Sequence, residues 1–281
     1  MINGELIDLA AGDYRARIAT SGATLVHLRR AGSDLVIPFD AEVSLPEGWQ
    51  GKTLVPWPNR IVGARYAYRG QEYPVPCNEP ETGSALHGLV GWADFQVVAT
   101  SAGDDAVGDA PSSVALELTL PGSYAYPWSL QVDVRFALDA RAGLTVAATT
   151  TCLGAGAPAA PDAVGAPESD GLLAPAPYGV SFHPYLTRSV PLDECVLQVP
   201  AARVLDVDER MAPAAERDVA GTDWDWRAGR PVGTISTDNA YTGLPQGPWE
   251  VRLTGGEAGS TVVLSAEAPW VQVYTAEHLG R

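Results

Sequence analysis

Two histidines in this sequence have neighbours that could support proton transfer. His183 lies in Pro-Tyr-Gly-Val-Ser-Phe-His-Pro-Tyr-Leu (177–186), between Phe182 and Pro184. Aromatic and apolar neighbours hold an imidazole ring still, exclude water and lower its pKa, because burial disfavours the cation. Such a group is suited to proton transfer near neutral pH. A histidine in a stretch of this kind is also typical of a protein core, with both ring nitrogens satisfied.

His87 has a different setting, a glycine-bracketed turn from Gly83 to Trp92 that follows an acidic loop. A histidine followed by glycine lets the backbone come close to a ligand, and Trp92 offers an aromatic face to a sugar. A turn histidine without a chemical role fits the same local features. The remaining two, His27 in an alternating strand and His278 near the C-terminus, are interpreted as ordinary half-buried or solvated residues.

Two further segments carry side chains that can form hydrogen bonds with sugar hydroxyls. Pro56-Trp-Pro-Asn-Arg-Ile sets Asn59 and Arg60 among rigid proline-bounded turns, and a fixed guanidinium donates several hydrogen bonds. Asp238 heads a short aromatic segment, and its carboxylate can accept two hydroxyl hydrogen bonds. A structural salt bridge at Arg60 and a turn cap at Asp238 are the alternatives.

Other classes of site have little support in the sequence. It contains no Gly-x-Gly-x-x-Gly, no phosphate loop and no Gly-x-Ser-x-Gly. A metal site on His87 and His183 is only a weak alternative, because no His-x-His or His-x-x-x-His spacing supports it. The formal charge of −16, from 34 acidic and 18 basic residues, disfavours nucleic acid and anionic membrane surfaces. A small neutral substrate remains compatible with this charge.

The segments that must position these residues alternate at period two, which predicts strands of a sandwich or barrel. The expected strands are 14–19, 24–28, 34–39, 94–100, 113–120, 129–138, 144–152, 195–199, 249–253, 261–266 and 270–275, with a hairpin over 66–75. Only Met211 to Asp218 is a possible helical turn. The fold class predicted is all-β.

The 281 residues fit one large all-β domain spanning 1–281. An Ala/Gly/Pro-rich stretch at 154–177 has no apolar periodicity, so we expect it to be a mobile loop within that domain. Cys77, Cys152 and Cys195 are far apart and odd in number, which indicates buried thiols in a reducing compartment. With no signal peptide or membrane span recognised, the expected location is cytoplasmic.

Taken together and in order, these motifs resemble the aldose 1-epimerase (galactose mutarotase) family. Order and spacing match across nearly the whole chain, and Pro-Trp-Pro-Asn-Arg resembles a bacterial subgroup. The residues that carry the resemblance are Asn59-Arg60-Ile61, Leu86-His87-Gly88, Tyr178-Gly179, Phe182-His183-Pro184-Tyr185, and Asp238 with Tyr241.

The resemblance implies a large antiparallel β-sandwich, the galactose mutarotase-like supersandwich, with a sugar in an open groove. It implies an isomerase that interconverts the α and β anomers of a free aldose hexose by acid/base ring opening. No metal or organic cofactor is needed, and the expected assembly is a monomer or homodimer. The implied catalytic residues are His183, as acid at the ring oxygen, and His87; the implied substrate-binding residues are Arg60, Asn59, Asp238 and Tyr185.

One departure from the family pattern concerns the general base. Family members carry a Glu in a Glu-Pro segment after the strand that corresponds to 270–275, whereas this sequence reads Ala276-Glu-His-Leu-Gly-Arg281. Glu277 has no following proline, and the role is not transferred to it. The alternatives are a shortened chain with impaired catalysis that still binds sugar, a base supplied differently, or an epimerase for a phosphorylated or sulfonated sugar. That last option would use Arg65 or Arg188.

Overall fold

The computed structural model describes residues 1–103, 105, 107–155, 175–188, 190–256 and 259–276. The chain forms two compact units, Met1–Leu28 with Pro38–Pro184 and Arg29–Ile37 with Tyr185–Arg281. Most of the stretch expected to be a mobile loop, from 156 to 174, lies outside the described residues, and so do Glu277 and His278. The single domain expected over 1–281 stays a prediction.

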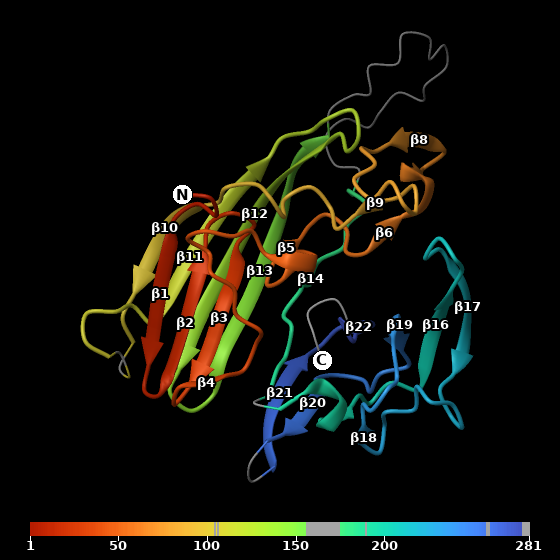
Figure 1. The fold of residues 1–281 in the computed structure, drawn as a ribbon. Coiled ribbons are helices and arrows are strands. Elements are labelled where there is room, and N and C mark those ends of the chain that lie inside the picture. Colours follow the sequence, from red (N-terminus) through yellow and green to blue (C-terminus); the bar gives the residue numbers. More distant parts are fainter. Residues whose placement is uncertain (104, 106, 156–174, 189, 257–258, 277–281) are drawn as a thin grey trace. The chain divides into compact units, whose positions relative to one another are not determined.

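Two antiparallel sheets pack against each other in the first unit (Figure 1). Strands β1 to β3 are neighbours in one sheet and strands β10 to β13 are neighbours in the other. Their bounds are β1 Leu6–Ala11, β2 Tyr14–Ala19, β3 Thr24–Arg30, β10 Gln96–Ser101, β11 Ser113–Leu120, β12 Trp128–Asp139 and β13 Gly143–Ala155. The interface between the sheets is the core of a β-sandwich.

Alternation along β12 shows why this sequence forms a half-buried strand. Leu130, Val132, Val134 and Phe136 are each at most 1% exposed, and the residues between them face away from the core. Burying one such side chain stabilises the fold by about 1.5–3 kcal/mol relative to leaving it exposed. The period-two pattern read from the sequence therefore gives the correct buried face here.

Short strand pairs in the first unit bring together segments that are far apart in sequence. Strand β5 (Thr53–Leu54) pairs with β14 (Ser181–Phe182), and β6 (Arg60–Ile61) pairs with β9 (Ala85–Leu86). Strands β7 (Arg65–Tyr68) and β8 (Gln71–Pro74) form the expected hairpin, which turns at Arg69 and Gly70. Two 3₁₀ turns, η1 (Glu47–Trp49) and η2 (Val62–Ala64), lie beside these pairs in the sequence.

The second unit also contains two four-stranded sheets, which share a core that includes Trp226, Tyr241 and Trp249. One sheet has the order β18 (Arg230–Pro231), β15 (Val196–Gln198), β20 (Trp249–Gly255), β21 (Ser260–Ala266). The other has the order β17 (Pro213–Asp218), β16 (Arg203–Val207), β19 (Asp238–Thr242), β22 (Val271–Tyr274). Strand β4 (Ser33–Asp34) pairs with the end of β3, and η3 (Leu192–Glu194) precedes β15.

The all-β prediction is confirmed: the described residues form antiparallel strands and three 3₁₀ turns, with no α-helix. The possible helical turn at Met211 to Asp218 is wrong, because Pro213–Asp218 is strand β17 paired with β16. The thiols also differ from the expectation, since Cys77 and Cys152 are exposed and only Cys195 is buried. No helix in the described residues is long and apolar enough to cross a membrane.

Candidate active site

His87 and His183 lie against each other in the first unit. Their ring centroids are 5.1 Å apart with an interplanar angle of 79°, an edge-to-face arrangement. His87 directly follows β9, and His183 directly follows β14. The strand pairs β6–β9 and β5–β14 thus deliver the two imidazoles from distant parts of the sequence to one place.

Backbone hydrogen bonds between Asn59 and His87 fix the His87 ring. The Asn59 N–H donates to Nδ1 of His87 at 3.0 Å, and the His87 N–H donates to the carbonyl of Asn59 at 2.8 Å. Both residues adopt left-handed backbone conformations, with φ of 57° and 63°. Because Nδ1 is the acceptor, the neutral ring carries its proton on Nε2.

Burial lowers the pKa of both imidazoles. It lowers the pKa of His87 to about 3, with further lowering from His183 and then from Arg60. It also lowers the pKa of His183 to about 4, against an opposing hydrogen bond to its own backbone. The lowered pKa of His183 has the direction expected from its apolar neighbours. Both rings are neutral at about pH 7.

Arg60 is held by a carboxylate that the sequence analysis did not single out. Its Nε and a terminal nitrogen donate to the two oxygens of Glu79 at 2.7 and 2.8 Å, while the other terminal nitrogen donates to Oδ1 of Asn59 at 3.1 Å. The Arg60 and Glu79 side chains are 13% and 17% exposed. The salt bridge weighed as an alternative for Arg60 is therefore present, and the Glu in the acidic loop was its available signal.

The pKa of Glu79 reflects two opposing effects. Burial raises it, but hydrogen bonds from Arg60 and Thr82 together with the Arg60 charge outweigh burial and lower it overall. Glu79 is consequently ionised near neutral pH and is a weak proton acceptor. Its place in the site is to orient the guanidinium of Arg60.

Two tryptophans line the His87 side of the site, and we call Trp49 and Trp92 the aromatic wall. The Trp49 ring lies 5.2 Å from that of His87 in an edge-to-face contact and 5.4 Å from that of Trp92. Trp92 is 48% exposed, so part of its ring is open to a ligand. The Lys52 ammonium lies 4.1 Å above the Trp92 ring. The sequence drew attention to Trp92 but missed Trp49 and Lys52, which no local motif marks.

The other predicted site residues belong to the second unit. Asp238 opens β19 and accepts a 2.7 Å hydrogen bond from the side-chain amide of Gln272. Tyr185 is buried and packs its ring against Tyr274, with centroids 6.1 Å apart. Burial, followed by Tyr274 and Asp238, raises the pKa of the Tyr185 phenol, which is therefore protonated near neutral pH. Of the predicted set, Asp238 and Tyr185 thus lie together within the second unit.

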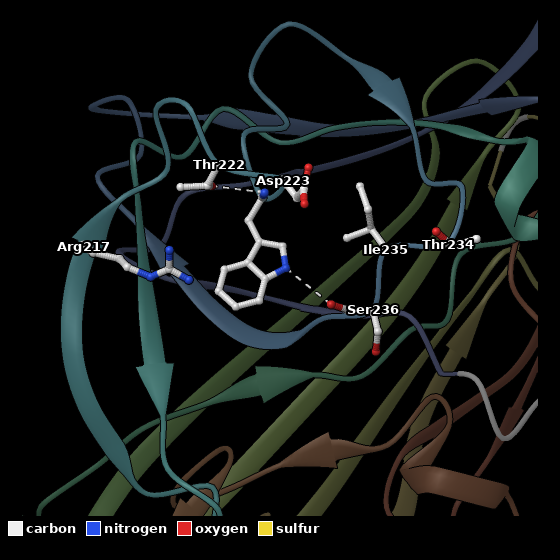
Figure 2. A pocket seen from close by; sticks show the side chains of 7 residues that line it. Arg217, Thr222, Asp223, Thr234, Ile235 and Ser236 are labelled. Atoms are coloured by element: carbon white, nitrogen blue, oxygen red, sulfur yellow. Dashed lines mark hydrogen bonds between the residues drawn. The ribbon is translucent and has the colours of Figure 1, made fainter.

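The second unit also has an open pocket of about 440 Å³, shown in Figure 2. The Arg217 guanidinium stacks 4.5 Å from the Trp224 ring, whose Nε1–H donates to the carbonyl of Ser236 at 3.3 Å. None of the predicted site residues lines this pocket. Its walls are Arg217, Thr222, Asp223, Trp224, Thr234, Ile235 and Ser236.

Metal-ligating side chains do not gather in threes or more anywhere in the described part of the chain. His87 and His183 remain a pair, with Nδ1 of His87 already engaged by Asn59. The chemistry that this arrangement offers is hydrogen bonding and proton transfer from imidazole, with a fixed guanidinium nearby.

Known proteins resemble this chain in sequence. The family model for aldose 1-epimerase matches residues 5–159 and 167–281. The uncharacterized protein YihR of Escherichia coli K12 is 36% identical over 280 residues, covering 99% of this chain and 82% of that protein.

Solved structures share the fold. A GalM/aldose epimerase homologue from C. elegans superposes with a TM-score of 0.74 at 21% identity, covering 96% of this chain and 81% of that one. Galactose 1-epimerase from Lactobacillus acidophilus gives a TM-score of 0.71 at 16% identity, covering 91% and 74%. The fold is thus the galactose mutarotase-like β-sandwich, and the chain belongs to the aldose 1-epimerase family.

Proposed function

We propose that this protein is an isomerase that interconverts the α and β anomers of a free aldose hexose. The observation that carries the proposal is the edge-to-face contact of His87 and His183, 5.1 Å between ring centroids, beside the Arg60 guanidinium. Anomer exchange needs a proton donor at the ring oxygen and a proton acceptor at the C1 hydroxyl. A sheltered imidazole pair is suited to the donor side of this chemistry.

His183 is the proposed acid. When a base removes the C1 hydroxyl proton, the C1–O5 bond breaks, the C1 carbonyl forms and O5 takes the proton from the His183 imidazolium. Rotation of the aldehyde and reclosure on its other face return both protons and give the other anomer. Since the His183 pKa of about 4 makes the imidazolium a minor species at about pH 7, the bound sugar must favour this protonated form.

His87 and its neighbours are proposed to hold the sugar. The Nε2–H of His87 faces away from the Asn59 bond at Nδ1 and is the donor that the ring can offer to a hydroxyl. Arg60, in β6, and Asn59, which directly precedes it, supply further polar groups. The resemblance also implies Asp238 and Tyr185, in the second unit, as residues that bind sugar hydroxyls, and they are proposed here in that role.

Members of the family that this sequence resembles carry the base in a Glu-Pro segment after the strand corresponding to β22. This sequence departs from that pattern, and Glu277 lies outside the described residues. Glu79 is a poor substitute, because its carboxylate is ion-paired with Arg60 and its pKa is lowered.

Polarimetry tests the proposal. Freshly dissolved α-glucose or α-galactose should reach its equilibrium rotation faster with the protein than in buffer. Decay at the buffer rate across common aldoses contradicts an epimerase. In that case, quenching of tryptophan fluorescence by millimolar sugar would identify a sugar-binding homologue without turnover, and the absence of quenching would exclude that function as well.

A further inference from the structure

Lys52 is the only lysine in the sequence, and the other 17 of its 18 lysine and arginine residues are arginines. Its residue is 0% exposed, which is rare for a lysine. Burial lowers the Lys52 pKa to about 8, and no carboxylate among the described residues forms an ion pair with it. A buried cation without a counter-ion lowers the stability of the fold. A structural role for the Lys52 ammonium would explain why it is kept at this position.

The contacts of the ammonium lead to the aromatic wall. Nζ donates to the carbonyl of Ser21 at 3.1 Å and lies 4.1 Å from the ring centroid of Trp92. A desolvated ammonium over an indole is attracted by about 2 kcal/mol. From Trp92 the ring contacts continue to Trp49 at 5.4 Å and then to His87 at 5.2 Å.

The main chain of Lys52 forms a hydrogen bond with His183. The His183 N–H donates to the carbonyl of Lys52 at 3.0 Å, and the Gly51 N–H donates to the carbonyl of His183 at 2.9 Å. These two bonds extend the β5–β14 pairing by one step. Lys52 thus contacts His183 through its backbone and reaches His87 through the aromatic wall.

We infer that Lys52 is a positioning residue whose ammonium fixes the aromatic wall against His87 and thereby sets the geometry of the His87–His183 pair. The effect on rate rests on the proposed function, whereas the effect on ring geometry does not. Lys52 itself is fully buried and does not touch the sugar.

The site accepts an ammonium more readily than a guanidinium. Gly22 lies so close that a Cβ there would come within 2.8 Å of Cδ of Lys52. The ammonium is a compact charge at the end of a slim stem, while a guanidinium is a wide planar fork. This crowding explains why arginine, used everywhere else in the chain, is not found at this position.

Three variants separate positioning from packing. Lys52→Met keeps the length of the side chain and removes the charge, and Lys52→Arg keeps the charge and changes its shape. Leu54→Met is the matched control, because Leu54 is 1% exposed and pairs with Ser181, two residues before His183, but carries no charge. The measurements are thermal unfolding, the imidazole resonances of His87 and His183 in ¹⁵N-histidine NMR, and kcat and KM for anomer exchange.

The expected result is that Lys52→Met unfolds at or above the wild-type temperature, since a buried charge is removed. Its His87 and His183 resonances should nevertheless shift, and kcat should fall by about tenfold or more at similar KM. Lys52→Arg should likewise show shifted histidine resonances and a lower kcat, because its guanidinium has a different shape. Leu54→Met should resemble wild type in both measurements. Wild-type histidine resonances in Lys52→Met would overturn the inference. If the wild-type protein lacks activity, the proposed function fails, and the resonances alone decide the role of Lys52.

Discussion

The main-chain N–H of Asn59 donates a 3.0 Å hydrogen bond to Nδ1 of His87. This bond assigns the neutral His87 ring as the Nε2–H tautomer, because a nitrogen that accepts a hydrogen bond carries no proton. Two-bond ¹⁵N–¹H correlations on ¹⁵N-histidine protein near neutral pH measure the tautomer directly. We expect the protonated nitrogen of His87 to be Nε2, and a protonated Nδ1 would show that the site is built differently.

The partly buried ion pair of Arg60 and Glu79 should contribute more to stability than an exposed pair of the same chemistry. Glu79→Gln leaves the guanidinium with a neutral acceptor, and we expect a loss of about 1–3 kcal/mol in the free energy of unfolding. Glu72→Gln is the matched control, because Glu72 pairs with Arg65 at 3.3 Å with side chains 66% and 55% exposed. Its cost should be below about 0.5 kcal/mol. Equal costs in urea titrations would contradict the structural weight given to Glu79.

Gly88 should tolerate no side chain. At φ +74° an added Cβ would overlap the carbonyl oxygen of Val55, whereas Gly83, at φ +71°, has nothing within 4 Å of a Cβ. Gly83→Ala therefore measures the backbone cost alone, about 1 kcal/mol. Gly88→Ala should cost at least about 2 kcal/mol, because overlap adds to strain. Similar unfolding free energies for the two variants would mean that the segment after His87 can move away from Val55.

Stability should fall as the solution is made acidic. The unfolded chain binds protons at its histidines below about pH 6.5, while burial holds the folded-state pKa of His183 at about 4 and that of His87 at about 3. The unfolded state binds more protons in this window, so the free energy of unfolding decreases as pH falls, on the order of 2 kcal/mol by about pH 5 for His183 alone. In His183→Asn this decrease should be smaller. An unchanged profile in that variant would contradict the burial assigned to the ring.

The catalytic rate should rise, not fall, as the solution is made more acidic. The proposed acid is the His183 imidazolium. At pH values above its pKa, the protonated fraction of His183 in the free protein increases about tenfold for each unit by which the pH is lowered. Enzyme-dependent kcat/KM, corrected for the buffer reaction, should therefore rise from about pH 8 to about pH 6. A fall over this range would assign the limiting proton transfer to another group.

The sequence predicted the long alternating strands well because each carries its own buried face, as Leu130 and Phe136 do in β12. It failed at β17, where Ala214, Ala215 and Glu216 have helical propensity, but pairing with β16 overrides it. The ordered motifs drew attention to Arg60, His87 and His183 because these residues lie within recognisable local patterns. Their partners Glu79, Trp49 and Lys52 were missed, since their roles depend on contacts between distant segments that no local pattern encodes.

Substitution of His183 by Asn tests the central claim most directly. Asn keeps a hydrogen-bonding side chain of similar size but cannot carry a proton to the ring oxygen. Polarimetry should show anomer exchange at the buffer rate, while sugar-dependent quenching of tryptophan fluorescence should retain a dissociation constant within about threefold of wild type. Exchange by His183→Asn at the wild-type rate would contradict the assignment of His183 as the acid.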